Sequence, residues 1–173
     1  LSPSSGPGQG QTHVVVSGQS FAFGSAYVCE FNSSRVEASY INDGQIECLS
    51  PSQPGTYTGD PAAVRVSLNA QQFVGNLSVP FAYHGHPRVD AISPTSGALV
   101  GGTLVNVSGG GFTGGVHYVC HFGSVRVGPV FVDEDGLISC LAPPGTAGET
   151  VPVEVSLNAQ QFSTQGAGFR YHE

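Results

Sequence analysis

The sequence predicts an all-β chain that contains two copies of the same β-sandwich. An octapeptide, Val-Ser-Leu-Asn-Ala-Gln-Gln-Phe, occurs at residues 66–73 and again, without change, at residues 155–162. Apolar and polar residues alternate in both copies, which is typical of a half-buried strand that runs into a turn. Gly and Pro are frequent, with 25 and 12 residues among 173, so short strands separated by turns are expected.

The match between the two halves extends far beyond the octapeptide. Tyr27-Val28-Cys29, for example, has its counterpart in Tyr118-Val119-Cys120. The spacing between matching residues shifts only slightly along the chain, so insertions are expected to fall in loops. We therefore expect two domains of common ancestry, residues 1–85 and residues 86–173, each large enough to bury its own core.

The same alternation places the strands of each copy. In the first copy we expect strands at residues 13–17, 27–31, 35–41, 46–49, 64–68 and 81–83. In the second copy we expect them at residues 87–92, 103–108, 117–122, 125–132, 137–141, 151–157 and 169–171. Residues 1–12 form an entry segment rich in Ser, Pro and Gly, and the first domain is expected to be cut just inside its own first strand. About seven short strands per copy is the number found in an immunoglobulin-like sandwich.

Four cysteines fall at equivalent places, two in each copy. This symmetry favours two disulfides within the domains, Cys29–Cys48 and Cys120–Cys140, and hence an oxidising compartment. Buried free thiols are the alternative, and a zinc site is less well supported because no Cys-x-x-Cys spacing occurs.

Three Asn-x-Ser sequons begin at Asn32, Asn76 and Asn106, and each is a candidate for N-glycosylation. Val105 and Val107 are expected to point inward, so Asn106 should face solvent, and Asn32 should lie in a turn. Together with paired cysteines, exposed sequons favour a secreted or cell-surface glycoprotein.

Further motifs suggest a family. They are Ile92-Ser93-Pro94, Gly101-Gly102-Thr103, Gly110-Gly111-Phe112, Cys120-His121-Phe122-Gly123, Ile138-Ser139-Cys140 and the closing Phe169-Arg170-Tyr171. In these the chain resembles the IPT/TIG domain, of the extracellular kind found in plexins and fibrocystin-like proteins, over nearly its whole length and twice. The first copy departs from the pattern with Gln11 for the second Gly and Asn32 for the Gly after Phe. The resemblance implies two tandem immunoglobulin-like (IPT/TIG) β-sandwiches, and structural motifs of this kind say little about function.

Few residues suggest chemistry. The glycine-rich run at 109–114 has the letters of a dinucleotide fingerprint, but strands are expected on both sides of it, so a turn is favoured. His84 and His86 could face a metal together, and the acidic residues 133–135 could contact Ca²⁺, but neither set has further ligands at suitable spacing. We expect no catalytic residue, no metal and no cofactor, because no nucleophile motif or unpaired cysteine stands out.

The charge pattern limits the partners. All five basic residues are Arg, and the formal net charge is −7, so no footprint for nucleic acid is visible. No apolar run approaches the ~18 residues that a membrane span needs, so no direct membrane insertion is expected here. The lack of Met indicates an excised fragment or a mature segment of a longer reading frame.

These observations favour a non-enzymatic extracellular structural or adhesion module within a longer array of IPT repeats. Its partners would be other extracellular proteins, neighbouring repeats or glycans. The exclusive use of Arg hints at a GC-rich genome, for which a cell wall or flagellar surface is a further possible location. The alternative is a carbohydrate-binding module attached to a secreted enzyme, with Tyr27, Tyr57 and Tyr118 as stacking faces.

Overall fold

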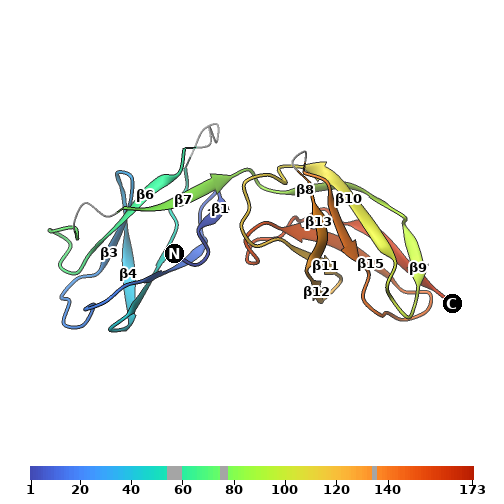
Figure 1. Ribbon diagram of the computed structural model, residues 1–173, viewed down its shortest axis with the longest axis horizontal. Coiled ribbons are helices and arrows are strands. Elements are labelled where there is room, and N and C mark those ends of the chain that lie inside the picture. Colours follow the sequence, from blue (N-terminus) through green and yellow to red (C-terminus); the bar gives the residue numbers. More distant parts are fainter. Residues whose placement is uncertain (54–59, 75–77, 134–135) are drawn as a thin grey trace. The chain divides into compact units, whose positions relative to one another are not determined.

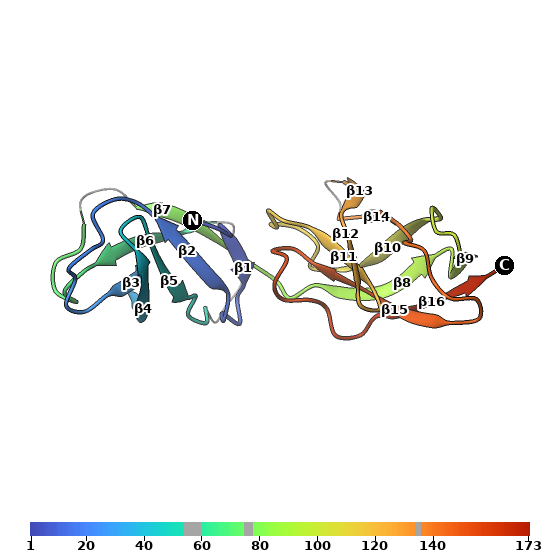
Figure 2. The same ribbon diagram turned by 90° about the horizontal axis from the view of Figure 1, so that it is seen from below.

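The computed structural model describes residues 1–53, 60–74, 78–133 and 136–173, and it divides into two compact units, Leu1–His84 and Gly85–Glu173. All regular structure in the described residues is β-strand (Figure 1, Figure 2). The all-β fold predicted from the sequence is therefore confirmed. Within these ranges no helix is long and apolar enough to cross a membrane.

The first unit contains seven described strands. They are β1 (Ser5–Pro7), β2 (His13–Ser17), β3 (Val28–Phe31), β4 (Ser34–Asn42), β5 (Gln45–Leu49), β6 (Ala62–Ser67) and β7 (Val79–His84), hydrogen-bonded in the order β1-β7-β6-β3-β4-β5-β2. The nine-residue β4 pairs with β3 through its first half and with β5 through its second. Hydrogen bonding is therefore continuous from one layer of this sandwich to the other.

The second unit forms two separate sheets. Its strands are β8 (Arg88–Ser93), β9 (Ser96–Ala98), β10 (Leu104–Gly110), β11 (Val119–Phe122), β12 (Val125–Val127), β13 (Pro129–Val132), β14 (Ile138–Leu141), β15 (Thr150–Ser156) and β16 (Ala167–His172). One sheet has the order β13-β14-β10-β8 and the other β12-β11-β15-β16-β9. The single strand expected at residues 125–132 is wrong, because Gly128 separates β12 from β13 and places them in different sheets.

Two short strands were not expected from the sequence. β1 pairs parallel with β7, and β9 pairs parallel with β16, in segments that lack apolar alternation. β1 lies within the entry segment 1–12, where the sequence pattern placed no strand. Ser2 also forms an isolated bridge with Val15, where the second unit has the six-residue β8.

Between β9 and β10 the chain passes from one sheet to the other at Gly101 and Gly102. Their φ angles of 82° and 81° lie in the left-handed region, which glycine enters without steric cost. In the first unit Gly10 and Gln11 take the same role, with φ angles of 80° and 64°. The corner is thus kept although Gln11 replaces glycine.

Each unit has its own core behind these strands. In the first unit the ring of Phe81 packs edge-on against Phe31 and Tyr83, with centroids 5.4 and 5.0 Å apart. In the second unit Phe169 packs in the same way between Phe122 and Tyr171, at 5.5 and 5.2 Å. The alternating aromatic residues near the end of each repeat therefore close the two cores.

Candidate functional site

The cysteines join the two layers of each unit. Cys29 on β3 is bonded to Cys48 on β5, and Cys120 on β11 is bonded to Cys140 on β14, with Cα atoms 6.4 and 6.6 Å apart. All four sulfur-bearing residues are buried and no cysteine is free. The disulfide bonds expected from the repeat symmetry are present.

Two of the three sequons lie in the described residues, and Asn76 lies outside them. Asn32 is exposed in the turn after β3, at φ 53°, and its Oδ1 accepts a hydrogen bond from the amide of Ala63 at 2.8 Å. Asn106 is exposed in the middle of β10, and its Oδ1 accepts a hydrogen bond from the hydroxyl of Ser139 at 2.7 Å. The outward position expected for Asn106 is what the structure shows, and glycosylation at these asparagines remains a prediction.

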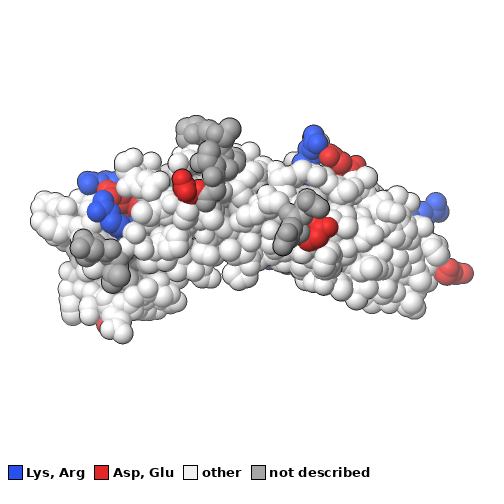
Figure 3. Space-filling model, turned by 45° about the horizontal axis from the view of Figure 1, so that its top comes forward, with Lys and Arg blue, Asp and Glu red and all other residues white. Residues whose placement is uncertain are grey.

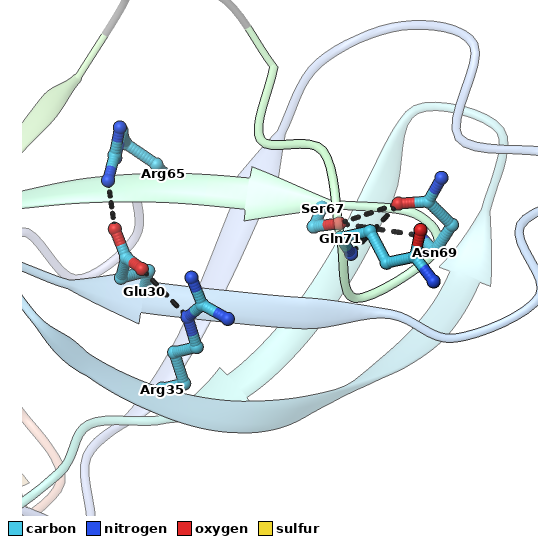
Figure 4. A network of polar contacts seen from close by, with 6 residues as sticks. All are labelled: Glu30, Arg35, Arg65, Ser67, Asn69 and Gln71. Atoms are coloured by element: carbon cyan, nitrogen blue, oxygen red, sulfur yellow. Dashed lines mark hydrogen bonds and ion pairs between the residues drawn. The ribbon is translucent and has the colours of Figure 1, made fainter.

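A cluster of charged side chains lies on the outer face of the sheet formed by β4, β3 and β6 (Figure 4). Glu30 on β3 is directly opposite Arg35 on β4 and Arg65 on β6. Nε of Arg35 donates to Glu30 Oε2 at 2.9 Å, and Nη2 of Arg65 donates to the other carboxylate oxygen. Glu30 itself is only 4% exposed. Hydrogen bonds from Arg35 and Arg65 lower the pKa of Glu30, against the opposing effect of burial.

Phe73 completes this cluster from the octapeptide turn. Its ring centroid lies 4.7 Å from the guanidinium carbon of Arg35 and 5.4 Å from that of Arg65. Oδ1 of Asn69 accepts hydrogen bonds from the amides of Gln71 and Gln72, both at 3.0 Å, and this side-chain bonding shapes the turn. The octapeptide therefore contains the end of a strand and a turn, and the turn places Phe73 over the two arginines.

The second copy of the octapeptide builds an equivalent cluster with different chemistry. Asn158 accepts from the amides of Gln160 and Gln161 at 3.1 Å each, and Phe162 stacks on His121 with a centroid distance of 3.8 Å. Nε of Arg126 donates to Nε2 of His121 at 3.0 Å. Burial and the charge of Arg126 lower the pKa of His121, although Glu154 acts in the opposite direction. The cluster was not predicted from the sequence, although arginine and phenylalanine recur at matching positions in both copies.

A loop of the first unit exposes an aromatic side chain. Phe23, between β2 and β3, is 104% exposed and has a φ angle of 64°, where the second unit has Gly114 at 84°. The loop around it is held in place because the Tyr27 hydroxyl donates to the carbonyl of Phe21 at 2.7 Å and accepts from the amide of Gly24 at 2.9 Å. A bulky residue in the left-handed region is a genuine outlier, and such outliers cluster at functional sites.

The tyrosines proposed as sugar-stacking faces have structural roles where they are described. Tyr118 repeats the bonding of Tyr27, with its hydroxyl 2.9 Å from the Phe112 carbonyl oxygen and 3.2 Å from the Gly115 amide. Both rings are half-buried. Tyr57 lies outside the described residues. The two described rings are therefore loop supports rather than open platforms.

Candidate metal ligands are not gathered together in the described residues. His84 is buried, and Nδ1 of His86 lies 3.0 Å from the carbonyl oxygen of Pro87. The described residues contain no group of three or more His, Cys, Asp and Glu that could hold a metal ion.

On the face shown in Figure 3 charged residues are sparse, and the arginines lie in separate groups. The glycine-rich run at 109–114 contains the last two residues of β10 and then enters the loop before β11, so strands lie on both sides of it, as expected.

Comparisons with known proteins agree with this architecture. Plexin-2 of Caenorhabditis briggsae is 32% identical over 111 residues, which is 64% of this chain and 6% of the relative. The calmodulin-binding transcription activator homolog 1 of Caenorhabditis elegans is 36% identical over 73 residues, which is 42% of this chain and 6% of the relative. The chain thus spans a small part of these relatives. The solved extracellular region of plexin A4 superposes with a TM-score of 0.60 at 20% identity, covering 92% of this chain and 14% of that one.

The fold and the repeated loop supports define a pair of tandem immunoglobulin-like modules. Residues 1–83 and 87–171 both match the IPT/TIG domain family, so the chain belongs to that family. The resemblance to plexin-type IPT repeats is confirmed by the sequence and structural relatives.

Proposed function

We propose that this chain is a non-enzymatic extracellular module that binds other proteins. Its two domains, residues 1–85 and 86–173, would form part of a longer cell-surface or secreted glycoprotein. Family membership, similarity to plexins and two disulfides support this function. Neighbouring IPT repeats are further candidate partners, and nucleic acid is not proposed because two of the five arginines share Glu30.

Phe23 is the observation on which the proposed contact rests. Its ring is fully exposed, yet hydrogen bonds of Tyr27 with residues on both sides hold its loop in one arrangement. Aromatic side chains are enriched among the residues that dominate binding energy at protein interfaces, and a fixed loop limits the entropy lost on binding. Phe23 is therefore the proposed anchor for a protein partner.

The test is a binding screen of the full chain against secreted ectodomains, with the chain itself included. Phe23→Gly is the informative variant because glycine already occupies the matching position, Gly114, in the second unit. A contact worth about 2 kcal/mol predicts binding weaker by roughly thirtyfold. Val100→Ser is the matched control, since Val100 is also strongly exposed, at 73%. Unchanged binding by Phe23→Gly would refute this contact, and binding of sugars alone would refute the function.

Glycans on Asn32, Asn76 and Asn106 belong to this proposal, as does an extracellular or cell-surface location. Exposure of Asn32 and Asn106 supports it. Tryptic mapping of protein secreted from a eukaryotic host would show which sites are occupied. The cell-wall or flagellar location remains a prediction from composition.

A carbohydrate-binding module on a secreted enzyme remains the alternative function. It has less support because the hydroxyls of Tyr27 and Tyr118 are used within their own loops. Retention of the chain on a glycan array, lost when Tyr57 is replaced, would favour this alternative.

A further inference from the structure

The outer face of the sheet β13-β14-β10-β8 carries apolar side chains that are exposed to solvent. Leu104 and Leu141 are directly opposite each other on β10 and β14 and are 48% and 44% exposed. Phe131 on β13, opposite Ser139, is 55% exposed. Side chains on one face of adjacent strands lie about 5 Å apart, so these residues form one patch.

Asn106 lies within this patch. It is opposite Ser139 on β14, which in turn is opposite Phe131 on β13, so the three residues form a row across three strands. Leu104 is two residues away on β10 and therefore on the same face. From Asn106 every apolar member of the patch is within about 10 Å, given a strand spacing of about 4.8 Å.

The carboxamide of Asn106 is also oriented. Ser139 is 5% exposed, and its hydroxyl donates to Oδ1 of Asn106 at 2.7 Å. Nδ2, the atom that carries the sugar in N-glycosylation, makes no hydrogen bond with any described residue. The hydrogen bond thus restrains the side chain through the oxygen and leaves the nitrogen available.

The first unit shows what this face looks like without a sequon. Val15 occupies the position of Asn106, and His13 and Glu47 occupy those of Leu104 and Ser139. Nδ1 of His13 lies 3.2 Å from a carboxylate oxygen of Glu47, so this face carries an exposed polar pair. Leu49, opposite His13, matches Leu141 and is 37% exposed, so the face with the sequon is the more apolar of the two because of Leu104 and Phe131.

We propose that an N-linked glycan on Asn106 packs over Leu104, Phe131 and Leu141 and shields this face from other protein chains. Attachment joins the anomeric carbon of the first N-acetylglucosamine to Nδ2. One amide proton is lost, and the lipid pyrophosphate of the oligosaccharide donor is the leaving group. The C–H groups of a sugar ring can lie on the phenyl ring and the leucine methyl groups, while its hydroxyls face water. This inference rests on the glycosylation included in the proposed function, but it does not depend on Phe23.

The experiment uses the full chain secreted from a eukaryotic host. Two variants, Asn106→Gln and Ser108→Ala, remove the same sequon through different side chains. Asn32→Gln is the matched control, because it removes a sequon in a turn of the other unit. Both Asn106→Gln and Ser108→Ala should show severalfold more self-association by sedimentation velocity and more binding of a hydrophobic dye. Asn32→Gln should show neither change.

A rescue variant identifies the cause. In the Asn106→Gln background, Leu104→His with Ser139→Glu copies the polar pair of the first unit and should restore the monomer. Enzymatic removal of the glycan from the folded wild type covers the case in which a variant fails to fold, and it should produce the same association. Secreted protein with Asn106 unmodified, or deglycosylated protein that stays monomeric and binds no more dye, would overturn the proposal. Either outcome would leave Phe23-dependent binding intact, so failure of the two proposals is distinguishable.

Discussion

Glu30 and His121 occupy the same position on equivalent strands, and their different chemistry shows where the two units diverged. Glu30 accepts hydrogen bonds from two arginines, whereas His121 accepts one from Arg126 and stacks on Phe162. Behind them, the paired cysteines and the three packed aromatic rings are the same in both units. The paired cysteines and aromatic rings that the units share belong to their cores, whereas Glu30 and His121 lie on an outer face.

The largest expected effect concerns a feature that the two units share. Replacing Cys29 and Cys48 by Ala, or Cys120 and Cys140, should lower the free energy of unfolding of the affected unit by about 3 kcal/mol. The loss should be similar in both, because the bridges close loops of 19 and 20 residues. Denaturant titration followed by hydrogen exchange of each unit measures it. A unit that retains its protection without its bridge would contradict the prediction.

Acid should destabilise the two units at different pH values. The lowered pKa of Glu30 contributes stability that is present above its unfolded value of 4.5 and is lost as pH falls through the lower folded value. The pKa of His121 is also lowered, so its contribution is present above 6.5 and is lost as pH falls from there. The second unit should therefore weaken at higher pH than the first.

Variants at these two positions test that order. Glu30→Gln should cost the first unit about 2 kcal/mol at neutral pH, because it removes charged hydrogen bonds from a buried position, and should flatten its acid transition. His121→Gln should remove the transition below pH 6.5 from the second unit alone. Hydrogen-exchange protection of each unit, measured as a function of pH, tests both variants. If the first unit lost stability at a higher pH than the second, the assignment of the two acid transitions to Glu30 and His121 would be refuted.

A smaller effect on stability is expected from substitutions at Phe23 and Gly114, which occupy equivalent loop positions in the two units. Phe23→Gly should stabilise the first unit by up to about 1 kcal/mol, because it removes a bulky side chain from the left-handed region. Gly114→Phe should destabilise the second unit by a similar amount. Thermal unfolding of the single variants measures both changes. A loss of stability in Phe23→Gly would show that the ring contributes to folding.

The smallest effect concerns the break between β12 and β13. Gly128 and Pro129 stand where the first unit has Glu37 and Ala38, and proline has no amide hydrogen to donate. Replacing Gly128 by Glu and Pro129 by Ala should join the two strands while changing stability by less than about 0.5 kcal/mol. New amide protection at residue 129 would show the joined strand. Unchanged protection would mean that other residues set the break.

The strands that bury alternate side chains could be predicted, and those formed by backbone alone could not. The alternation of buried Val14 and Val16 predicts β2. In contrast, β1 and β9 consist of Ser, Gly, Pro and Ala, and they are strands only because β7 and β16 lie beside them. The charged cluster depends on the register that places Glu30 opposite both Arg35 and Arg65. That register is a tertiary property. The cluster therefore could not be predicted from the sequence, even though its residues recur in both copies.

The parallel pairing of β1 with β7, the first and last strands of the first unit, has a mechanical consequence. In the first unit the amide of Ala82 donates to the Ser4 carbonyl and the amide of Gly8 to the His84 carbonyl, both at 2.9 Å. Tension that draws the two ends of the unit apart pulls β1 and β7 in opposite directions along their length. The hydrogen bonds between them are then sheared together instead of opening one after another. β9 pairs with β16 in the same parallel way, but β8 precedes β9 in the second unit and pairs with β10, so this shear geometry applies to the first unit alone.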